Sequence, residues 1–337
     1  MRIFLFIALL FSTLTFGGFF YLSYAAQHAS GGNSQVQRFE VKQGEGMFSL
    51  GERLEAAGLI SSRYVFLWHL VRVEKTHNLV AGTYSLSGEM SVAGIALVIT
   101  EGKTVSRDVR ITFPEGWNSK KMAERLTANG LPGASFLRLV EKPQPELRNQ
   151  FDFLSALPIG ATLEGFLFPD TYFFDPQTSA EAIVEKMLTN FGKKFDSALR
   201  MAAEKQKRSL FATVTLASIV ENEVKTETDR KIVADIFSRR LAIGQALQSC
   251  ATLQYILGVD RVQYSYAETQ TPSPYNTYIN PGLPPGPIGN PGLMTLNATI
   301  SPQANPYFYF LNDPKTGETI FSITYEEHLK NKSLHGL

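Results

Sequence analysis

Two glutamates, Glu221 and Glu223, stand near the end of the apolar segment SLFATVTLASIVENEVK, residues 209–225. Apolar residues recur in this segment at the spacing of a buried helix face; they are Leu210, Val214, Ala217 and Val224. Position 221 falls on the same face, so the spacing predicts that Glu221 is buried. Burial favours the protonated form of a carboxylate, which suits a general acid near neutral pH. At about 100° per residue, Glu223 lies ~200° around the helix from Glu221, so both cannot serve one small cleft equally. The helix is apolar nearly all round, so its geometry does not show which of the two glutamates is the catalytic one.

The structural alternative is that both glutamates are buried and neutralised by arginines, with Arg239 or Arg240 as the partner. Two further acids, Glu164 and Asp170, occur in ATLEGFLFPDTYFF at 161–174. The alternation of Phe166 and Phe168 predicts a strand, followed by a turn at Pro169-Asp170. As turn or cap residues these acids need no catalytic role.

The segment SPYNTYINPGLPPGPIGNPG, residues 273–292, is rich in proline and glycine. The spacing from Gly282 to Gly286 breaks the three-residue period of collagen, and a PxxP ligand is one alternative. A rigid loop lining a cleft is the favoured interpretation. It follows four residues whose aromatic, amide and hydroxyl groups are typical of sugar binding: Tyr275, Asn276, Thr277 and Tyr278.

Composition excludes several other classes of protein. The 32 Lys and Arg residues nearly balance the 31 Asp and Glu residues, so no basic field indicates nucleic acid. Cys250 is the single cysteine, which rules out an internal disulfide, and its role is expected to be dispensable. The five histidines form no HExxH pattern. We therefore expect neither a metal nor a cofactor.

Residues 3–25 form an uncharged apolar run. At about 1.5 Å per residue this run is long enough for a transmembrane helix, and it exceeds the usual length of a signal-peptide core. A cleaved signal ending near Ala25 is the alternative. With Arg2 preceding the run, residues 1–25 predict a cytoplasmic N-terminus and an inner-membrane anchor, so that the rest lies on the periplasmic face. A polar tether follows at 26–37.

The remainder predicts an α+β fold in two parts. Within residues 38–158, the segment 41–60 weakly resembles the segment 111–131. Each is predicted to form a strand, an E-G turn and an amphipathic helix. The first helix is expected to end at Gly58 and the second at Gly130. Such units look like the LysM fold, a glycan-binding module, although many α+β domains contain them. A helix over 61–75 is expected to pack His69, and Ser91 to cap another helix.

The second part, residues 159–337, is predicted to be a mixed α+β catalytic domain. Helices are expected at 209–225, at 229–243 with Asp229 as its N-cap and Gly244 as its stop, and at 247–258. A hairpin around 313–317 and a short C-terminal helix close the chain.

Four strings in this order resemble the endolytic murein transglycosylases, the YceG-like family. They are LASIVENE at 216–223, FSRRLAIGQALQS at 237–249, YNTYINPGLPPGPIGNPG at 275–292 and NPYFYF at 305–310. EGFLFPDTY, the LysM-like region and the single anchor fit the family too, so that the resemblance covers nearly the whole chain. Two departures are Cys250-Ala251, where the family commonly has Asp-Pro, and Asp229 in place of a Glu.

The resemblance implies a lyase that cuts peptidoglycan glycan strands at the outer face of the inner membrane and ends nascent strands. Peptidoglycan synthases are then candidate partners. Glu221 matches the family's catalytic glutamate; one carboxylate can protonate the bond between MurNAc and GlcNAc and then deprotonate the attacking C6 hydroxyl. The substrate is expected to contact Glu223, Gln248, Ser249, Tyr275, Asn276, Thr277, Tyr278, Gly282, Leu283, Pro284 and Pro285.

Two other functions stay open at this point. A hydrolytic muramidase would pair Glu221 with a second carboxylate such as Asp229. A membrane-tethered glycan-binding scaffold would have no activity, and Glu221 would then be a buried structural residue.

Overall fold

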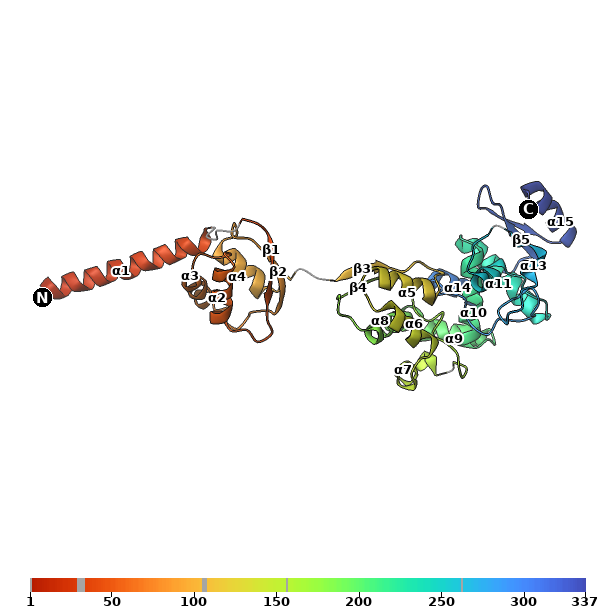
Figure 1. The fold of residues 1–337 in the computed structure, drawn as a ribbon, viewed down its shortest axis with the longest axis horizontal. Coiled ribbons are helices and arrows are strands. Elements are labelled where there is room, and N and C mark those ends of the chain that lie inside the picture. The colour runs from red at the N-terminus through yellow and green to blue at the C-terminus, as the bar shows by residue number, and fades with distance from the viewer. Residues whose placement is uncertain (1, 29–33, 105–107, 156, 262) are drawn as a thin grey trace. The chain divides into compact units, whose positions relative to one another are not determined.

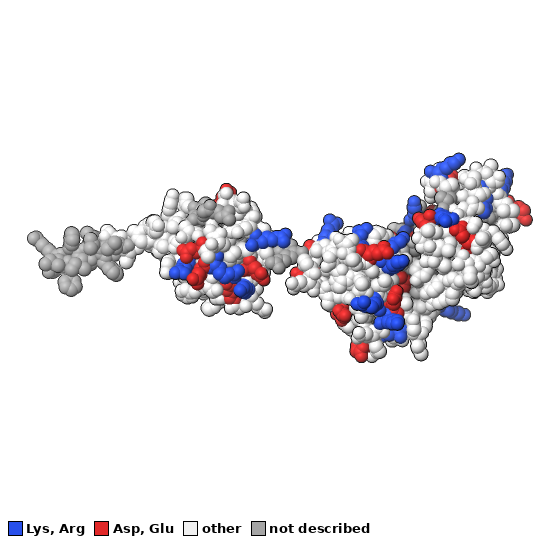
Figure 2. All heavy atoms as spheres, in the orientation of Figure 1, with Lys and Arg blue, Asp and Glu red and all other residues white. Residues whose placement is uncertain are grey.

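The computed structural model describes residues 2–28, 34–104, 108–155, 157–261 and 263–337. The chain forms two compact units, residues 1–107 and 108–337 (Figure 1). Helices predominate, and the strands form two-stranded antiparallel sheets, so the predicted α+β class is confirmed. On the face drawn in Figure 2, positive and negative side chains lie next to one another in groups, in keeping with the near-zero net charge.

The first unit is built on strands β1 (Gln37–Val41) and β2 (Gly82–Leu86), with Phe39 opposite Tyr84. Between the strands lie α2 (Met47–Ala56) and α3 (Arg63–Arg72), and α4 (Val92–Thr100) follows β2. Ser91 caps α4 by accepting from the Gly94 N–H at 3.0 Å, as predicted. His69 is buried in α3, also as predicted.

Helix α1 (Arg2–Gln27) is the first element of this unit. Its last turns pack on α3, where the rings of Phe19 and Trp68 lie 5.7 Å apart and Arg72 donates to Ser23 Oγ at 2.7 Å. The side chains at 2–12 and 14 lie outside the described part. Within the described part, no helix combines the length and the apolar character that a membrane crossing requires. The anchor at 3–25 therefore stays a prediction.

The second unit begins with a repeat of the same plan. Strand β3 (Val109–Thr112) leads into α5 (Ser119–Ala128) and α6 (Gly133–Glu141), and β4 (Thr171–Phe174) returns antiparallel to β3. Gly58 and Gly130 stop α2 and α5 with φ angles of 68° and 77°. The expected boundary between 158 and 159 therefore differs from the structure. Residues 108–158 share a core with the later helices because β3 pairs with β4.

The segment around Phe166 and Phe168 does not form the predicted strand. The N–H groups of Gly165 and Leu167 both donate to the Asn290 side chain, at 2.9 and 3.0 Å, instead of to a neighbouring strand. The strand begins only after the Pro169-Asp170 turn, as β4. The side chain of Asn290 thus accepts the backbone hydrogen bonds that a neighbouring strand would accept in a sheet.

Helix α10 (Leu210–Glu223) runs through the middle of the second unit, with Ser209 as its N-cap. One side of it packs into a core with α5, α6 and α8 (Ala180–Lys194), and the other side packs against α11 (Glu227–Ala242). Burial on both sides explains why its sequence is apolar nearly all round. Thr226, not Asp229, caps α11 by accepting from the Asp229 N–H.

Shorter elements complete the unit. They are α7 (Pro145–Gln150), the 3₁₀ turn η1 (Asp152–Leu154), α9 (Ser197–Lys205), α12 (Cys250–Leu257), α13 (Tyr266–Thr269) and α14 (Leu293–Ile300). The predicted hairpin is present as β5 (Tyr309–Asn312) and β6 (Thr319–Ser322), and α15 (Tyr325–His335) packs on it. Within this unit the hairpin and α15 lie at the opposite end from β3 and β4 (Figure 1).

Candidate active site

Glu221 lies in the last turn of α10, and its carboxylate is almost fully enclosed. Arg230 of α11 donates from Nη2 to Glu221 Oε1 at 2.6 Å. The two side chains are only 3% and 9% exposed, respectively. A charge-assisted hydrogen bond in such a buried place fixes the position of the carboxylate strongly.

The second oxygen of Glu221 is held by the start of α14. Oε2 accepts from the Gly292 N–H at 2.9 Å and from the Thr295 hydroxyl at 2.6 Å. Together with Arg230, three donors therefore surround this carboxylate. Such a set orients both oxygens of the carboxylate.

Glu115, in the loop between β3 and α5, is a second carboxylate at the same place. Its Oε2 lies 3.8 Å from Nη2 of Arg230, the nitrogen that also binds Glu221. In contrast to Glu221, its side chain is 48% exposed. Partial burial raises the pKa of Glu115, the negative charge of Glu221 raises it further, and Arg230 opposes both effects.

Two glycines let these loops approach one another. At Gly116, with φ of 79°, a Cβ would lie 3.3 Å from Glu221 Cγ. At Gly292, a Cβ would lie 1.8 Å from Glu115 Oε1, so the Glu115 carboxylate rests directly on the Gly292 backbone. Any side chain at Gly292 would displace Glu115.

Glu164 lies in a neighbouring buried cluster rather than beside Glu221. Its carboxylate accepts from the Ser119 N–H and hydroxyl, and from the Asn290 amide at 2.7 Å. Burial raises the pKa of Glu164 to about 7, although these donors oppose the shift. Asn290 also donates to the Trp117 carbonyl at 3.0 Å. The cluster thereby ties the loop that carries Glu115 to the loop that carries Gly292.

Glu223 points into a different cluster, at the start of α12. It accepts from the Ser249 hydroxyl and from the Ala251 N–H at 3.1 Å. Burial raises its pKa, and the hydrogen bond from Ser249 opposes this. Next to it, Cys250 Sγ lies 3.1 Å from the Tyr278 hydroxyl, and burial raises the pKa of this thiol to about 11.

Several of the residues predicted to bind sugar contact one another around the start of α12. Asn276, Thr277 and Ser249 are buried and hold the backbone of the loop and of α12. Gln248 is exposed with φ of 51°, and its N–H donates to the Thr277 carbonyl. In the GLPP string, Gly282 has φ of 95°, Leu283 packs on the α10–α11 core, Pro284 is buried and Pro285 is exposed.

Tyr275 lines a cavity of about 400 Å³ together with Glu164. Tyr255 stands beside Tyr275, with ring centroids 5.1 Å apart. The polar side chains of Asn118, Ser119 and Thr162 also face this cavity. Aromatic rings with hydroxyl and amide groups are suited to a saccharide.

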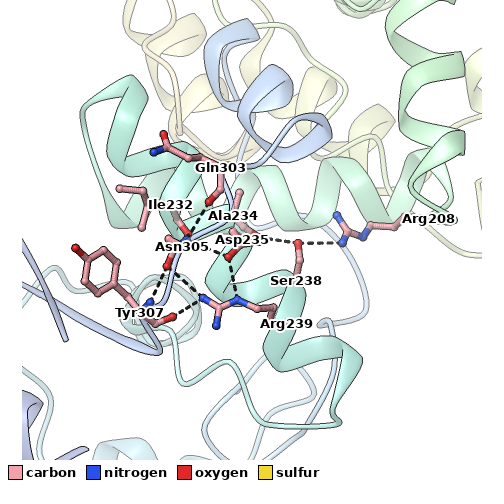
Figure 3. A network of polar contacts seen from close by, with 9 residues as sticks. All are labelled: Arg208, Ile232, Ala234, Asp235, Ser238, Arg239, Gln303, Asn305 and Tyr307. Atoms are coloured by element: carbon pink, nitrogen blue, oxygen red, sulfur yellow. Dashed lines mark hydrogen bonds and ion pairs between the residues drawn. The ribbon is translucent and has the colours of Figure 1, made fainter. Parts of the chain in front are cut away.

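The arginine partner of Glu221 is Arg230, and not Arg239 or Arg240, which the structural alternative offered for this role. Arg239 binds Asp235 at 2.9 Å and the Tyr307 carbonyl, in the network around Asn305 (Figure 3). Arg240 donates to the carbonyls of Leu247 and Phe308, both at 2.6 Å. Arg239 and Arg240 therefore attach the segment at 305–308 to α11. Arg240 also attaches Leu247 to this helix.

The remaining predicted acids have other partners. Asp170 accepts from the Asn190 side chain at 3.0 Å and caps the turn before β4. Asp229 accepts from the Thr319 hydroxyl at 3.2 Å. Sequence reasoning missed Glu115, Arg230 and Thr295. The E-G turn of the internal repeat was the one signal that pointed to Glu115.

Comparisons with known proteins identify the family to which the chain is similar. Residues 39–333 match the model of the YceG-like family. A Bacillus subtilis protein named endolytic murein transglycosylase is 29% identical over 327 residues, which cover 94% of this chain and 89% of that protein. A Streptococcus pneumoniae protein of the same name is 28% identical, covering 88% of this chain and 57% of its own length. A Listeria monocytogenes YceG-like protein, solved at 2.6 Å, superposes with a TM-score of 0.59 at 33% identity and covers 89% of this chain and 100% of its own.

Proposed function

The chain belongs to the YceG-like family, and we propose on this basis that it is an endolytic murein transglycosylase. Its substrate is the glycan strand of peptidoglycan, cut between MurNAc and GlcNAc. The observation that carries the proposal is the enclosed Glu221, fixed by donors from two helices beside the open carboxylate of Glu115.

The reaction proposed is an intramolecular displacement. The C6 hydroxyl of MurNAc attacks its own C1 while the bond from C1 to the GlcNAc oxygen breaks, which leaves a 1,6-anhydro end. The hydroxyl loses a proton and the leaving oxygen gains one. The attacking group belongs to the substrate, so no water has to be activated and a high effective concentration is available.

Glu221 is the carboxylate on which we place this proton transfer. Both of its oxygens are oriented before substrate arrives, by Arg230 on one side and by Gly292 and Thr295 on the other. A base held in this way needs little reorganisation during the reaction. In the simplest scheme Glu221 serves both transfers in turn, which requires one carboxylate where a hydrolase generally needs two.

We also propose that the tyrosine-lined cavity and the first unit hold the glycan. Tyr275 and Tyr255 offer apolar ring surfaces beside polar groups. The repeated strand–helix–helix–strand plan supports a LysM-like, glycan-binding role for residues 38–158. Glu223, Gln248 and Ser249 would then shape the edge of the cleft through the backbone of α12.

The proposed location is the periplasmic face of the inner membrane, with residues 3–25 as an uncleaved anchor. There the enzyme would end nascent strands beside peptidoglycan synthases. Membrane fractionation with N-terminal sequencing tests the location. A mature N-terminus near Ala26, with release of the protein on spheroplasting, would contradict it.

Product analysis tests the activity. The full-length protein is incubated with purified glycan strands, and the products are identified by mass spectrometry. Internal 1,6-anhydro ends are expected. New reducing ends in their place would mean hydrolysis, and intact strands would mean a binding protein without activity.

A further inference from the structure

The two copies of the internal repeat carry glutamates at matching positions, but these glutamates have different partners. In the first copy, Glu45 of the E-G turn accepts from Arg53 of the helix that follows, at 2.7 Å, and its side chain is only 4% exposed. Arg53 also donates to the Glu40 carbonyl in β1. Glu45 therefore has a structural role within its own repeat unit.

In the second copy the matching arginine is engaged elsewhere. Arg125 keeps the bond to the strand, donating to the Thr112 carbonyl at 3.3 Å, but its guanidinium lies 4.6 Å from the centre of the Trp117 ring. Trp117 and Asn118 are extra residues in this turn, relative to the first copy. The matching glutamate, Glu115, lies instead against Gly292 and near Arg230.

Glu115 and Glu221 thus flank one nitrogen, Nη2 of Arg230, with very different exposure. Glu221 accepts from three donors and is 3% exposed, whereas Glu115 is 48% exposed. A bound glycan can reach Glu115 without displacing any of these donors. A carboxyl that must give up a proton to a sugar oxygen needs such access.

We propose that Glu115 is a second catalytic residue, the general acid that protonates the leaving GlcNAc oxygen, while Glu221 is the base for the MurNAc C6 hydroxyl. This rests on the transglycosylase activity proposed above. In the step, Glu115 loses its proton to the oxygen as the C1–O bond breaks. Glu221 takes the C6 hydroxyl proton as the new bond from O6 to C1 forms. A proton passing from Glu221 to Glu115, directly or through water, restores the starting state.

The electrostatics of the pair agree with this division. Two carboxylates near each other do not both ionise easily, and the one with fewer donors keeps the proton. Burial and the charge of Glu221 raise the pKa of Glu115, which favours its protonated form. The three donors around Glu221 hold both of its oxygens in fixed positions.

The test compares Glu115→Gln, Glu115→Asp and Glu221→Gln in the full-length protein, with Glu204→Gln on the exposed surface of α9 as the control. Two substrates are used: glycan strands, and a MurNAc glycoside whose nitrophenol leaving group departs without protonation. Formation of anhydro product is measured as kcat and KM for both. Unfolding temperatures show that the variants are folded.

We expect Glu115→Gln to lower kcat on strands by about 10²- to 10⁴-fold with little change in KM, and to lose less than about tenfold on the nitrophenyl substrate. Glu115→Asp should retain more activity than Glu115→Gln, and Glu221→Gln should lose activity on both substrates. Equal losses of Glu115→Gln on both substrates, or activity within about threefold of wild type on strands, would overturn the role of Glu115 and leave the proposed function intact. Absence of anhydro product from the wild type would instead refute the proposed function and this inference with it.

Discussion

Arg230 and Glu221 form an ion pair at 2.6 Å although they come from different helices, and both side chains are almost fully buried. The pair joins the end of α10 to the first turns of α11, across a short turn that begins at Val224. Removing one partner of such a pair leaves a buried charge without compensation, which typically destabilises by about 3–5 kcal/mol. The pair therefore matters for folding as well as for chemistry.

Asn290 should be among the most sensitive positions for stability. It is fully buried and accepts from the Gly165 and Leu167 N–H groups. Asn290→Ala leaves both donors unpaired, at about 1–3 kcal/mol each, so we expect the free energy of unfolding in urea to fall by at least about 2 kcal/mol. Asn129→Ala, at an exposed helix end, is the control, and its free energy of unfolding should fall by less than about 1 kcal/mol. Equal stability of the two variants would contradict the role of Asn290.

Glu164 predicts a particular dependence of stability on pH. Its pKa is about 7 in the folded state against 4.5 without the fold, so the folded state holds the proton more tightly. The resulting stabilisation is fully present below about pH 4.5 and is lost as the pH rises through 7. The stability advantage of wild type over Glu164→Gln should thus be larger at pH 5 than at pH 8, by about 2–3 kcal/mol. An advantage that grew with pH would show that the hydrogen bonds to Glu164 outweigh its burial.

Glu223→Gln is expected to affect stability more than chemistry. Glu223 connects α10 to Ser249 and Ala251 at the start of α12, and none of these contacts involves Glu221. We expect the unfolding temperature to fall and the rate of anhydro product formation to fall by less than about tenfold. If Glu223→Gln abolished cleavage while Glu221→Gln retained it, the assignment of the two glutamates would have to be exchanged.

Cys250 should be replaceable. Burial and the nearby Glu223 raise the pKa of its thiol to about 11, so it is protonated and a poor nucleophile near neutral pH. Cys250→Ser keeps a polar contact to the Tyr278 hydroxyl. Activity within about threefold of wild type is expected in the strand assay. A loss of more than tenfold in a folded variant would show that the cleft has been misinterpreted.

Local sequence patterns predicted the elements whose signals are local. The glycine stops at Gly58 and Gly130, the Ser91 cap and the hairpin before α15 each depend on residues a few positions apart. The strand predicted around Phe166 and Phe168 was wrong, because the N–H groups of this segment donate to Asn290, more than 120 residues away. The N-cap of α11 was misplaced by three residues, from Thr226 to Asp229, both of which are suitable cap types.

The candidate site was predictable only in part, for the same reason. Periodicity placed Glu221 on a buried stripe, and its side chain is indeed enclosed. Its partners come from three separate segments, with Arg230 on α11, Thr295 on α14 and Glu115 after β3. A sequence period describes one helix at a time and does not tell which distant loops pack against it. Arg239 and Arg240, which the structural alternative offered as partners of the glutamates, donate instead to backbone carbonyls.

The most direct test of the central claim is product analysis of Glu221→Gln beside wild type, on glycan strands with mass spectrometry. The variant keeps the shape of the side chain but cannot take up the C6 hydroxyl proton, so we predict a loss of anhydro product of at least about 10²–10⁴-fold. The ion pair with Arg230 predicts that the free energy of unfolding of this variant falls by about 3 kcal/mol. Assays are therefore run well below the unfolding temperature of the variant. Anhydro product from folded Glu221→Gln at near the wild-type rate would contradict the account.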